Sequence, residues 1–227
     1  MKALIIDIDG TLTDESRRLD LAAADAIRKL DIPVILASGN VLCFVKCATK
    51  LIGTSDIMIA ENGGVISSGF DGPVRIKGDH TRCAGVLEML RGHFELEELD
   101  AADRLSDVAL RRNFDIEAAR HIIADNGITN VELVDTGFAV HIKSMDVNKG
   151  TALLEVAALI GLDAGDIVAI GDSANDIEML QAAGLGVAVG NANPALKDIA
   201  DMVTSGRYGT GVVEALKYAD KSSLWED

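Results

Sequence analysis

The sequence is poor in cysteine, proline and aromatic residues. Its 227 residues include three cysteines and three prolines, and aromatic residues make up 4% of the chain. An odd number of cysteines leaves at least one outside any internal disulfide, and Cys43, Cys47 and Cys83 lack the spacing of a zinc site. This usage favours a reduced, cytoplasmic enzyme over a disulfide-stabilised protein.

Positive charge and long hydrophobic runs are scarce as well. The chain carries 21 basic and 36 acidic residues, for a net charge of −15. A nucleic-acid binder needs a basic face to neutralise phosphates, and a protein that binds an anionic membrane surface needs basic residues for the same reason. No apolar stretch approaches the roughly 20 residues of a membrane span, and the apolar run near Met1 is too short for a signal peptide. We therefore expect no nucleic-acid or membrane partner.

The apolar sequence that is present predicts an α/β protein. Hydrophobic residues make up 48% of the 227 residues, a length that suits one large domain or one domain with an insert. Short apolar runs typical of strands buried on both faces alternate with helical patterns in both halves. These runs are Ala3–Ile8, Pro33–Ala37, Ile57–Ala60, Ile167–Ile170 and Gly186–Val189. We expect a Rossmann-like parallel sheet flanked by helices.

The middle of the chain has a different order: helix, strand, helix, strand, strand. The pieces are approximately Arg82–Phe94, Asp107–Phe114, Ile116–Asn126, Thr129–Val134 and Phe138–Lys143. The alternating pattern of the first predicted strand is typical of a sheet with one open face. We expect a small α+β cap domain over residues 79–148, inserted into a discontinuous core of residues 1–78 and 149–227. Its hinges would lie near residues 78–81 and 144–148.

Two pairs of acidic residues follow predicted strands. Asp7 and Asp9 share one side of the first strand's end, and Gly10 lets the chain turn away from them. Asp172 follows a later strand and Asp176 falls in the first turn of the next helix. Parallel sheets bind ligands at this edge, and clustered carboxylates hold Mg²⁺ through oxygen. Solvated loop acids are the alternative for the first pair, and a helix-dipole interaction is the alternative for Asp176.

Two further segments combine polar groups with strand ends and helix starts. Ser38, Gly39 and Asn40 follow the second predicted strand, where a hydroxyl and backbone amides cradle a phosphate or simply cap a helix. Lys149 lies where the chain returns into the core, and there it would be one cation beside several acids. It is either a surface lysine near a helix start or a cation placed at the acidic site. A lysine is unfavourable at a helix N-terminus, which favours a role beyond capping.

Taken together, these motifs identify a family resemblance over the whole chain. DIDGT, LASGN, the lysine of DVNKG, and GDSANDIEM resemble the four motifs of the haloacid dehalogenase superfamily. The position of the insert resembles the C2-type cap of the Cof-like branch, and within it the chain is similar to the archaeal-type phosphoglycolate phosphatases. Many other members of that branch carry arginine where this chain has Asn40.

The resemblance implies a mechanism and a set of site residues. Asp7 would be the nucleophile that forms an aspartyl-phosphate, and Asp9 the general acid and base. Mg²⁺ would be held by Asp7, the Asp9 carbonyl and Asp172, with Asp176 completing or supporting the site. The phosphate-binding residues expected are Ser38, Gly39, Lys149 and Asn175. The implied substrate is a small phosphorylated acid, 2-phosphoglycolate first of all.

Several alternatives stay open from the sequence. A sugar-phosphate phosphatase or phosphomutase would use the same motifs, and a phosphoacceptor signalling module clusters acids, Mg²⁺ and a lysine in a similar way. The cap cations available for a substrate carboxylate are Arg111, Arg112, His141 and Lys143. Monomer and homodimer are both compatible with the composition. Trp225, in the tail after Lys221, suggests packing against the core or a second subunit.

Overall fold

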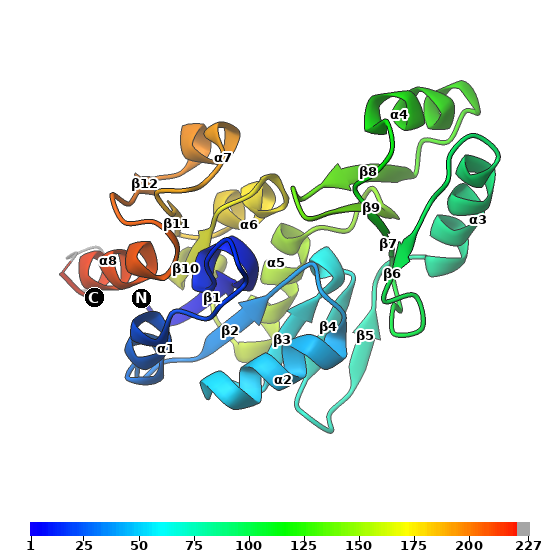
Figure 1. Ribbon diagram of the computed structural model, residues 1–227. Coiled ribbons are helices and arrows are strands. Elements are labelled where there is room, and N and C mark those ends of the chain that lie inside the picture. Colours follow the sequence, from blue (N-terminus) through cyan, green and yellow to red (C-terminus); the bar gives the residue numbers. More distant parts are fainter. Residues whose placement is uncertain (222–227) are drawn as a thin grey trace.

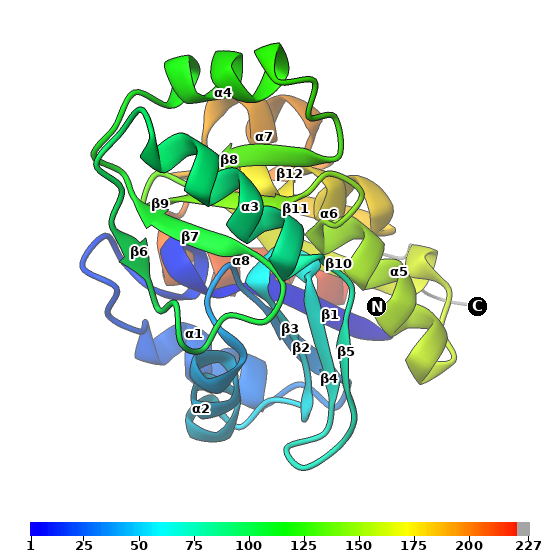
Figure 2. The same cartoon turned by 90° about the vertical axis from the view of Figure 1, so that its right-hand side faces the viewer.

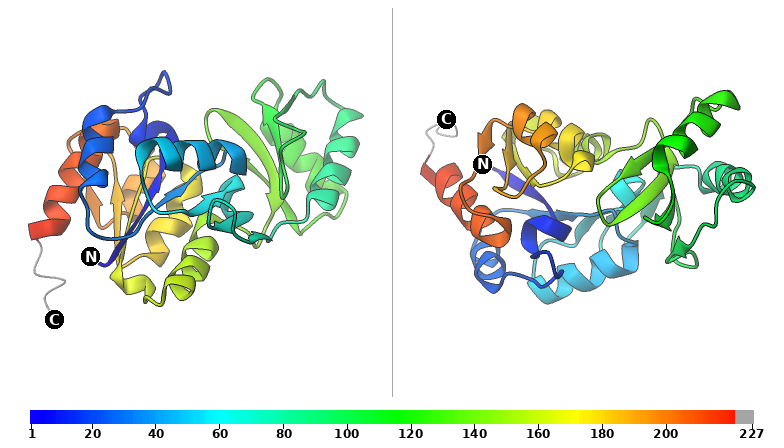
Figure 3. Two further views of the ribbon diagram at one scale, coloured as in Figure 1. Left: turned by 90° about the horizontal axis from the view of Figure 1, so that it is seen from below. Right: turned by 45° about the horizontal axis from the view of Figure 1, so that its top comes forward.

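The computed structural model describes residues 1–221 and contains two β-sheets, each with its own hydrophobic core. Figure 1 shows the larger sheet with helices on both faces and the smaller sheet beside it, and both views of Figure 3 show the two parts side by side. No helix among these residues is long and apolar enough to cross a membrane. The Trp225 expectation falls on residues outside the described part of the chain.

The larger sheet has eight strands in the order β12-β11-β10-β1-β2-β3-β4-β5. Neighbours from β12 to β3 are parallel, and β4 and β5 extend the sheet as antiparallel strands. The parallel strands are β1 (Ala3–Asp7), β2 (Val34–Ala37), β3 (Ile57–Ala60), β10 (Ile167–Gly171), β11 (Leu185–Ala188) and β12 (Met202–Val203). The antiparallel edge consists of β4 (Val65–Ser68) and β5 (Val74–Ile76).

Side-chain alternation along β1 explains why both faces of this sheet are covered. Leu4 and Ile6 pack into one hydrophobic cluster, whereas Ala3 and Ile5 pack into another on the opposite face. Helices on the first face are α1 (Leu21–Arg28), α2 (Leu42–Ile52) and α8 (Tyr208–Lys221). Helices on the second face are α5 (Lys149–Ile160), α6 (Ile177–Ala182) and α7 (Pro194–Ile199). The doubly covered parallel sheet that the sequence predicts is confirmed.

The smaller sheet is antiparallel, with strand order β6-β7-β9-β8. Its strands are β6 (Glu98–Leu99), β7 (Val108–Arg111), β8 (Val131–Asp135) and β9 (Ala139–Ser144). Two helices, α3 (His80–Arg91) and α4 (Ile116–Asp125), pack on the face that contains Val140 and Ile142, and Figure 2 looks onto this part of the molecule. His141 and Lys143 therefore lie on the opposite face, which turns toward the larger sheet.

The two connections between the sheets run side by side. The backbone N–H of Asp79, just before α3, donates at 3.0 Å to the hydroxyl of Ser144, the last residue of β9. The very short or exposed strands β5, β6 and β12 were not predicted, because two or three residues carry too little periodicity to detect.

Candidate active site

The candidate site lies where three neighbouring parallel strands end. Strand β1 pairs with β10 on one side and β2 on the other, so their carboxyl ends meet at one edge. Asp7 is the last residue of β1, Ser38 follows β2, and Asp172 follows β10. The strand order thus brings together side chains separated by more than a hundred residues in the sequence.

The turn after β1 explains the residues of the first motif. The chain leaves Asp7 in a short π-helical turn, Ile8–Leu12, in which Gly10 has a φ of 87°. A Cβ atom on Gly10 would lie 2.4 Å from Oδ2 of Asp172, so glycine is required both for the backbone angle and for this close approach. The Thr11 hydroxyl donates to Oδ1 of Asp172 at 3.2 Å and orients that carboxylate toward the site.

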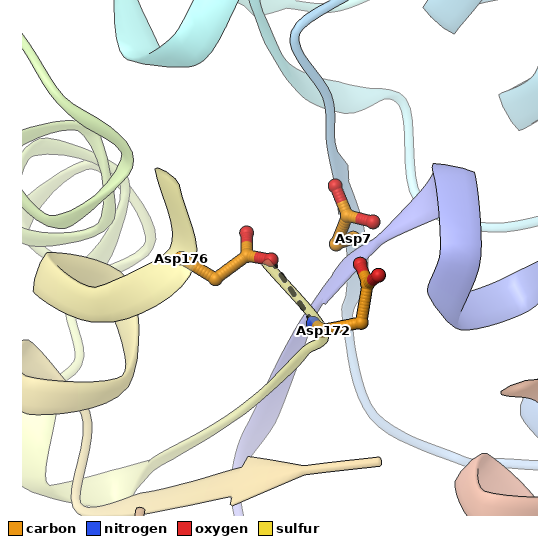
Figure 4. Close-up of side chains that lie close together, drawn as sticks. All are labelled: Asp7, Asp172 and Asp176. Atoms are coloured by element: carbon orange, nitrogen blue, oxygen red, sulfur yellow. Dashed lines mark hydrogen bonds between the residues drawn. The ribbon is translucent and has the colours of Figure 1, made fainter. Parts of the chain in front are cut away.

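Three carboxylates gather at this edge, as Figure 4 shows. Asp7, Asp172 and Asp176 each offer an oxygen atom, and these atoms lie within 4.8 Å of one another. Oδ2 of Asp7 is buried and has no hydrogen-bond partner within residues 1–221. Burial raises the pKa of Asp7 well above its usual range, and burial together with the charge of Asp176 raises the pKa of Asp172 to about 7. An unpartnered oxygen among crowded carboxylates fits a bound divalent cation.

Lys149 is the cation that the cluster already contains. Its side chain is fully buried, and its ammonium group donates to Asp7 and to Asp176, both at 2.6 Å. Burial works to lower the pKa of Lys149, but the carboxylates of Asp176 and Asp7 outweigh it and hold this pKa above its usual value. The surface-lysine alternative is therefore wrong. Asn148 caps α5 through the Thr151 N–H, which fixes where the lysine enters the site.

Asp176 has two structural roles. One oxygen atom accepts the Lys149 ammonium, and the other accepts the backbone N–H groups of Asp172 and Ser173 at 3.1 Å. The reciprocal bond with Ser173 forms a capping box for the turn before α6. The helix-terminus interaction and the place in the acidic cluster are therefore compatible, because the carboxylate has an oxygen for each.

Asp9 lies apart from the three clustered carboxylates and lines the neighbouring cavity. The Asn40 amide donates to its Oδ2 at 2.5 Å, and Arg17 lies 3.9 Å from its Oδ1. Asn40 also donates through Nδ2 to the Ser38 hydroxyl at 3.1 Å. Asn40 therefore orients the second acid of the first motif.

The remaining predicted residues surround the same edge. Ser38 is buried and accepts the Asn40 N–H, whereas α2 begins later with Val41 at its N-cap, so Ser38 does not cap this helix. A Cβ on Gly39 would lie 2.9 Å from the side-chain oxygen Oδ1 of Asn62, and the Asn175 amide donates to that oxygen at 2.8 Å. Nδ2 of Asn62 is buried and has no hydrogen-bond partner among the residues that the structure describes. Asn62 was not predicted, because its Asn-Gly dipeptide predicts only a turn.

A cavity of about 80 Å³ lies between the two sheets at this site. Asp7, Asp9, Asn40 and Asn175 line it from one side, and Arg104 and His141 from the other. Of the four cap cations predicted, only His141 lines this cavity. Arg111 and Arg112 form exposed ion pairs with Glu97 and Asp135, and Lys143 pairs with Glu132. Arg104 was missed because it lies in a loop without a motif or a periodic pattern.

Comparison with known proteins identifies the family. The family of haloacid dehalogenase-like hydrolases matches residues 4–74 and 103–216. The chain is 49% identical over 224 residues to a phosphoglycolate phosphatase of Methanococcoides burtonii, with 99% of both chains covered. It is 50% identical over 217 residues to a phosphoglycolate phosphatase of Archaeoglobus fulgidus, with 96% of both chains covered.

Solved structures show the same fold. A crystal structure from Thermoplasma acidophilum matches with a TM-score of 0.87 at 24% identity, over 97% of this chain and 98% of that one. A phosphatase of the haloalkanoate enzyme superfamily from Bacteroides thetaiotaomicron matches with a TM-score of 0.80 at 24% identity, over 96% of this chain and 94% of that one. By sequence over most of its length, this chain belongs to the family of haloacid dehalogenase-like hydrolases.

Proposed function

We propose that this chain is a Mg²⁺-dependent phosphomonoesterase that hydrolyses 2-phosphoglycolate to glycolate and phosphate. The observation that carries the reaction class is the buried Asp7 carboxylate, with Oδ1 held by Lys149 and Oδ2 left without a partner beside a cavity. The phosphoglycolate phosphatases that are about half identical over nearly the full length support this substrate. The family supports hydrolysis.

In the proposed first step, an oxygen atom of Asp7 attacks phosphorus. The phosphorus–oxygen bond to the leaving group breaks, Asp9 gives its proton to the departing alkoxide, and an aspartyl-phosphate remains. Asp9 then accepts a proton from water, and the resulting nucleophile releases inorganic phosphate and regenerates Asp7. The Asn40 amide donates to Oδ2 of Asp9 at the cavity, which supports this role for Asp9.

A divalent cation fits the donor set of this site. We propose that Asp7, Asp172 and the backbone carbonyl of Asp9 would hold Mg²⁺, with Asp176 supporting them. When bound, the cation neutralises charge on the carboxylates and on the transferring phosphoryl oxygens. The unpartnered Oδ2 of Asp7 and the raised pKa values of Asp7 and Asp172 support this proposal, because buried carboxylates that share the one Lys149 ammonium resist full ionisation.

Four groups are proposed to hold the phosphate. Lys149 supplies positive charge and restrains Asp7, and the Ser38 hydroxyl and the Gly39 backbone amide lie at the end of β2 next to that carboxylate. Asn175 lines the cavity from the third strand end. These groups would stabilise negative charge that spreads over the phosphoryl oxygens during transfer.

The size of the cavity favours a small leaving group. Its volume of about 80 Å³ leaves little room beside a bound phosphate for a large leaving group. We propose that residues 79–148 act as a cap over a core of residues 1–78 and 149–227. A two-carbon acid suits this enclosure better than a hexose, which disfavours the sugar-phosphate alternative.

The proposal is tested by initial rates of phosphate release with Mg²⁺. The substrates are 2-phosphoglycolate, 3-phosphoglycerate, a hexose phosphate and an aryl phosphate. We expect kcat/KM for 2-phosphoglycolate to exceed the others by about 100-fold, which corresponds to about 2.7 kcal/mol of transition-state discrimination. A higher kcat/KM for the hexose phosphate than for 2-phosphoglycolate would refute the proposed substrate but would still support phosphomonoester hydrolysis. A stable phosphorylated protein that releases no phosphate would refute hydrolysis.

A further inference from the structure

A buried cluster of charged side chains forms the side of the cavity opposite the acidic site. Arg104 is 8% exposed, His141 is 3% exposed and Asp107 is fully buried. Oδ1 of Asp107 accepts a hydrogen bond from Nη1 of Arg104 at 2.5 Å. The other oxygen atom, Oδ2, forms a hydrogen bond with Nδ1 of His141 at 2.9 Å. Arg104 and His141 both line the cavity, and neither is used by the four motifs of the family resemblance.

Arg104 and His141 each keep one nitrogen free for a further hydrogen bond. Nη1 of Arg104 bonds to Asp107 and to the Gly39 carbonyl, and Nη2 bonds to that same carbonyl at 3.3 Å, so one N–H of Nη2 has no acceptor in the described part of the chain. Within residues 1–221, Nε2 of His141 has no hydrogen-bond partner, because the Asp107 contact uses Nδ1. An imidazolium donates through both nitrogens. Each side chain therefore has one nitrogen left for a ligand.

The buried acids nearby are already satisfied. Both oxygen atoms of Asp107 are occupied, and Arg104 and His141 together hold its pKa below the usual value although burial acts in the opposite direction. Glu61 accepts the backbone N–H groups of Ser106 and Asp107. Asp100 lies on the exposed rim of the cavity. The buried part of this cavity wall therefore presents the nitrogen atoms of Arg104 and His141 to the cavity, while the carboxylates of Asp107 and Glu61 are already occupied by hydrogen bonds.

We propose that the free N–H of Arg104 and Nε2 of His141 bind the carboxylate of the substrate and set the preference for small phosphorylated carboxylic acids. This inference rests on the proposed function, because it needs the phosphate bound at the opposite wall near Asp7. A carboxylate offers two oxygen atoms, one for each free nitrogen, and its hydrogen bond to a guanidinium is charge-assisted. Asp107 is a positioning residue that orients both Arg104 and His141 through its two oxygen atoms.

The experiment compares two substrates that differ only at the carboxylate, 2-phosphoglycolate and ethyl phosphate. In His141→Asn, the amide nitrogen replaces Nδ1 and keeps the contact with Asp107, but no atom occupies the place of Nε2. Arg104→Lys keeps the charge and removes the fork. Arg111→Gln is the matched control, since this arginine lies on the same sheet in an exposed ion pair with Glu97.

We expect His141→Asn to lower kcat/KM for 2-phosphoglycolate by about 10- to 100-fold, the range for one hydrogen bond to a charged group. Its rate on ethyl phosphate should stay at the wild-type value. Arg104→Lys should show the same selective loss, and Arg111→Gln should change neither rate. Equal losses on both substrates, no loss on either, or a wild-type enzyme without preference for the carboxylate would overturn the inference.

A binding measurement separates this inference from the proposed reaction. Asp7→Asn lacks the nucleophile, so calorimetry with 2-phosphoglycolate and Mg²⁺ measures affinity without turnover. Adding His141→Asn to this variant should weaken the affinity by about 10-fold or more. If the wild-type protein hydrolysed no phosphomonoester, a weaker affinity caused by the His141 change would still support the carboxylate site, and the missing activity would refute the proposed function. Equal affinities with and without the His141 change would refute the carboxylate site.

Discussion

Replacing Lys149 by methionine should strongly destabilise the protein, because it removes the only cation inside the acidic cluster among the described residues. The ammonium group is fully buried and lies 2.6 Å from a carboxylate oxygen of Asp7 and 2.6 Å from one of Asp176. At an effective dielectric constant of about 20, each contact corresponds to roughly 6 kcal/mol of gross Coulomb attraction. Desolvation of the ammonium offsets much of this gain.

The net loss of stability depends on the two carboxylates, Asp7 and Asp176, that remain after the lysine is removed. Methionine has a similar length, so the cavity is small, but the two carboxylates remain buried without their counter-charge. Removing one partner of a buried ion pair costs about 3–5 kcal/mol. We expect a decrease of this size in the free energy of unfolding of the metal-free Lys149→Met protein at pH 7. At pH 5 the decrease should be smaller, because protonation of Asp7, whose pKa is already raised, removes one of the uncompensated charges.

The assay is urea unfolding followed by circular dichroism with a chelator present, at pH 7 and pH 5. Lys2→Met is the matched control, since Lys2 forms a 3.0 Å ion pair with Asp166 while its side chain is 58% exposed. An exposed pair of this kind contributes at most about 1 kcal/mol. A loss in Lys149→Met no larger than in Lys2→Met, or a loss that grows at pH 5, would refute the electrostatic reasoning.

Four further perturbations test the site and its surroundings. Asp7→Asn should keep the wild-type circular dichroism spectrum and release no phosphate, because an amide cannot act as the carboxylate nucleophile; phosphate release at the wild-type rate would remove Asp7 from that role. Chelation should abolish phosphate release and Mg²⁺ should restore it, whereas activity that survives exhaustive chelation would contradict the metal assignment. In metal-free protein the free energy of unfolding should fall by about 2–4 kcal/mol as pH rises from about 4 to about 7. The reason is that burial raises the pKa of Asp172 to about 7, so that over this range the folded state binds more protons than the unfolded state. The same dependence on pH in Asp172→Asn would refute this origin. Glu61→Gln should cost about 1–3 kcal/mol and speed amide hydrogen exchange at Leu105 and Ser106, which donate to that carboxylate, and unchanged exchange at both would contradict the bond pattern.

Local patterns in the sequence predict the α/β class and the edge at which the site forms. A strand buried on both faces needs a continuous apolar run, so Ala3–Ile8 and Ile167–Ile170 could be recognised without knowledge of their partners. Asp7 and Asp172 follow such runs, and parallel strands place their ends at one edge. The family motifs add expected roles for Asp9 and Lys149, which the predictions above test.

Tertiary structure decides the features that join distant segments. Burial of Lys149 between two carboxylates depends on the packing of α5 and α6 under β1 and β10, and its sequence context is equally typical of a surface residue. Arg104 lies in a loop, and its contacts reach Gly39, 65 residues away. His141 could be placed on one face of its strand by alternation, but which face turns toward the cavity depends on where α3 and α4 pack. The sequence alone therefore determines the longer elements and the polar residues at strand ends, because both can be recognised from local patterns. The cavity wall opposite Asp7 is decided only by the fold, because its residues meet through packing between two sheets.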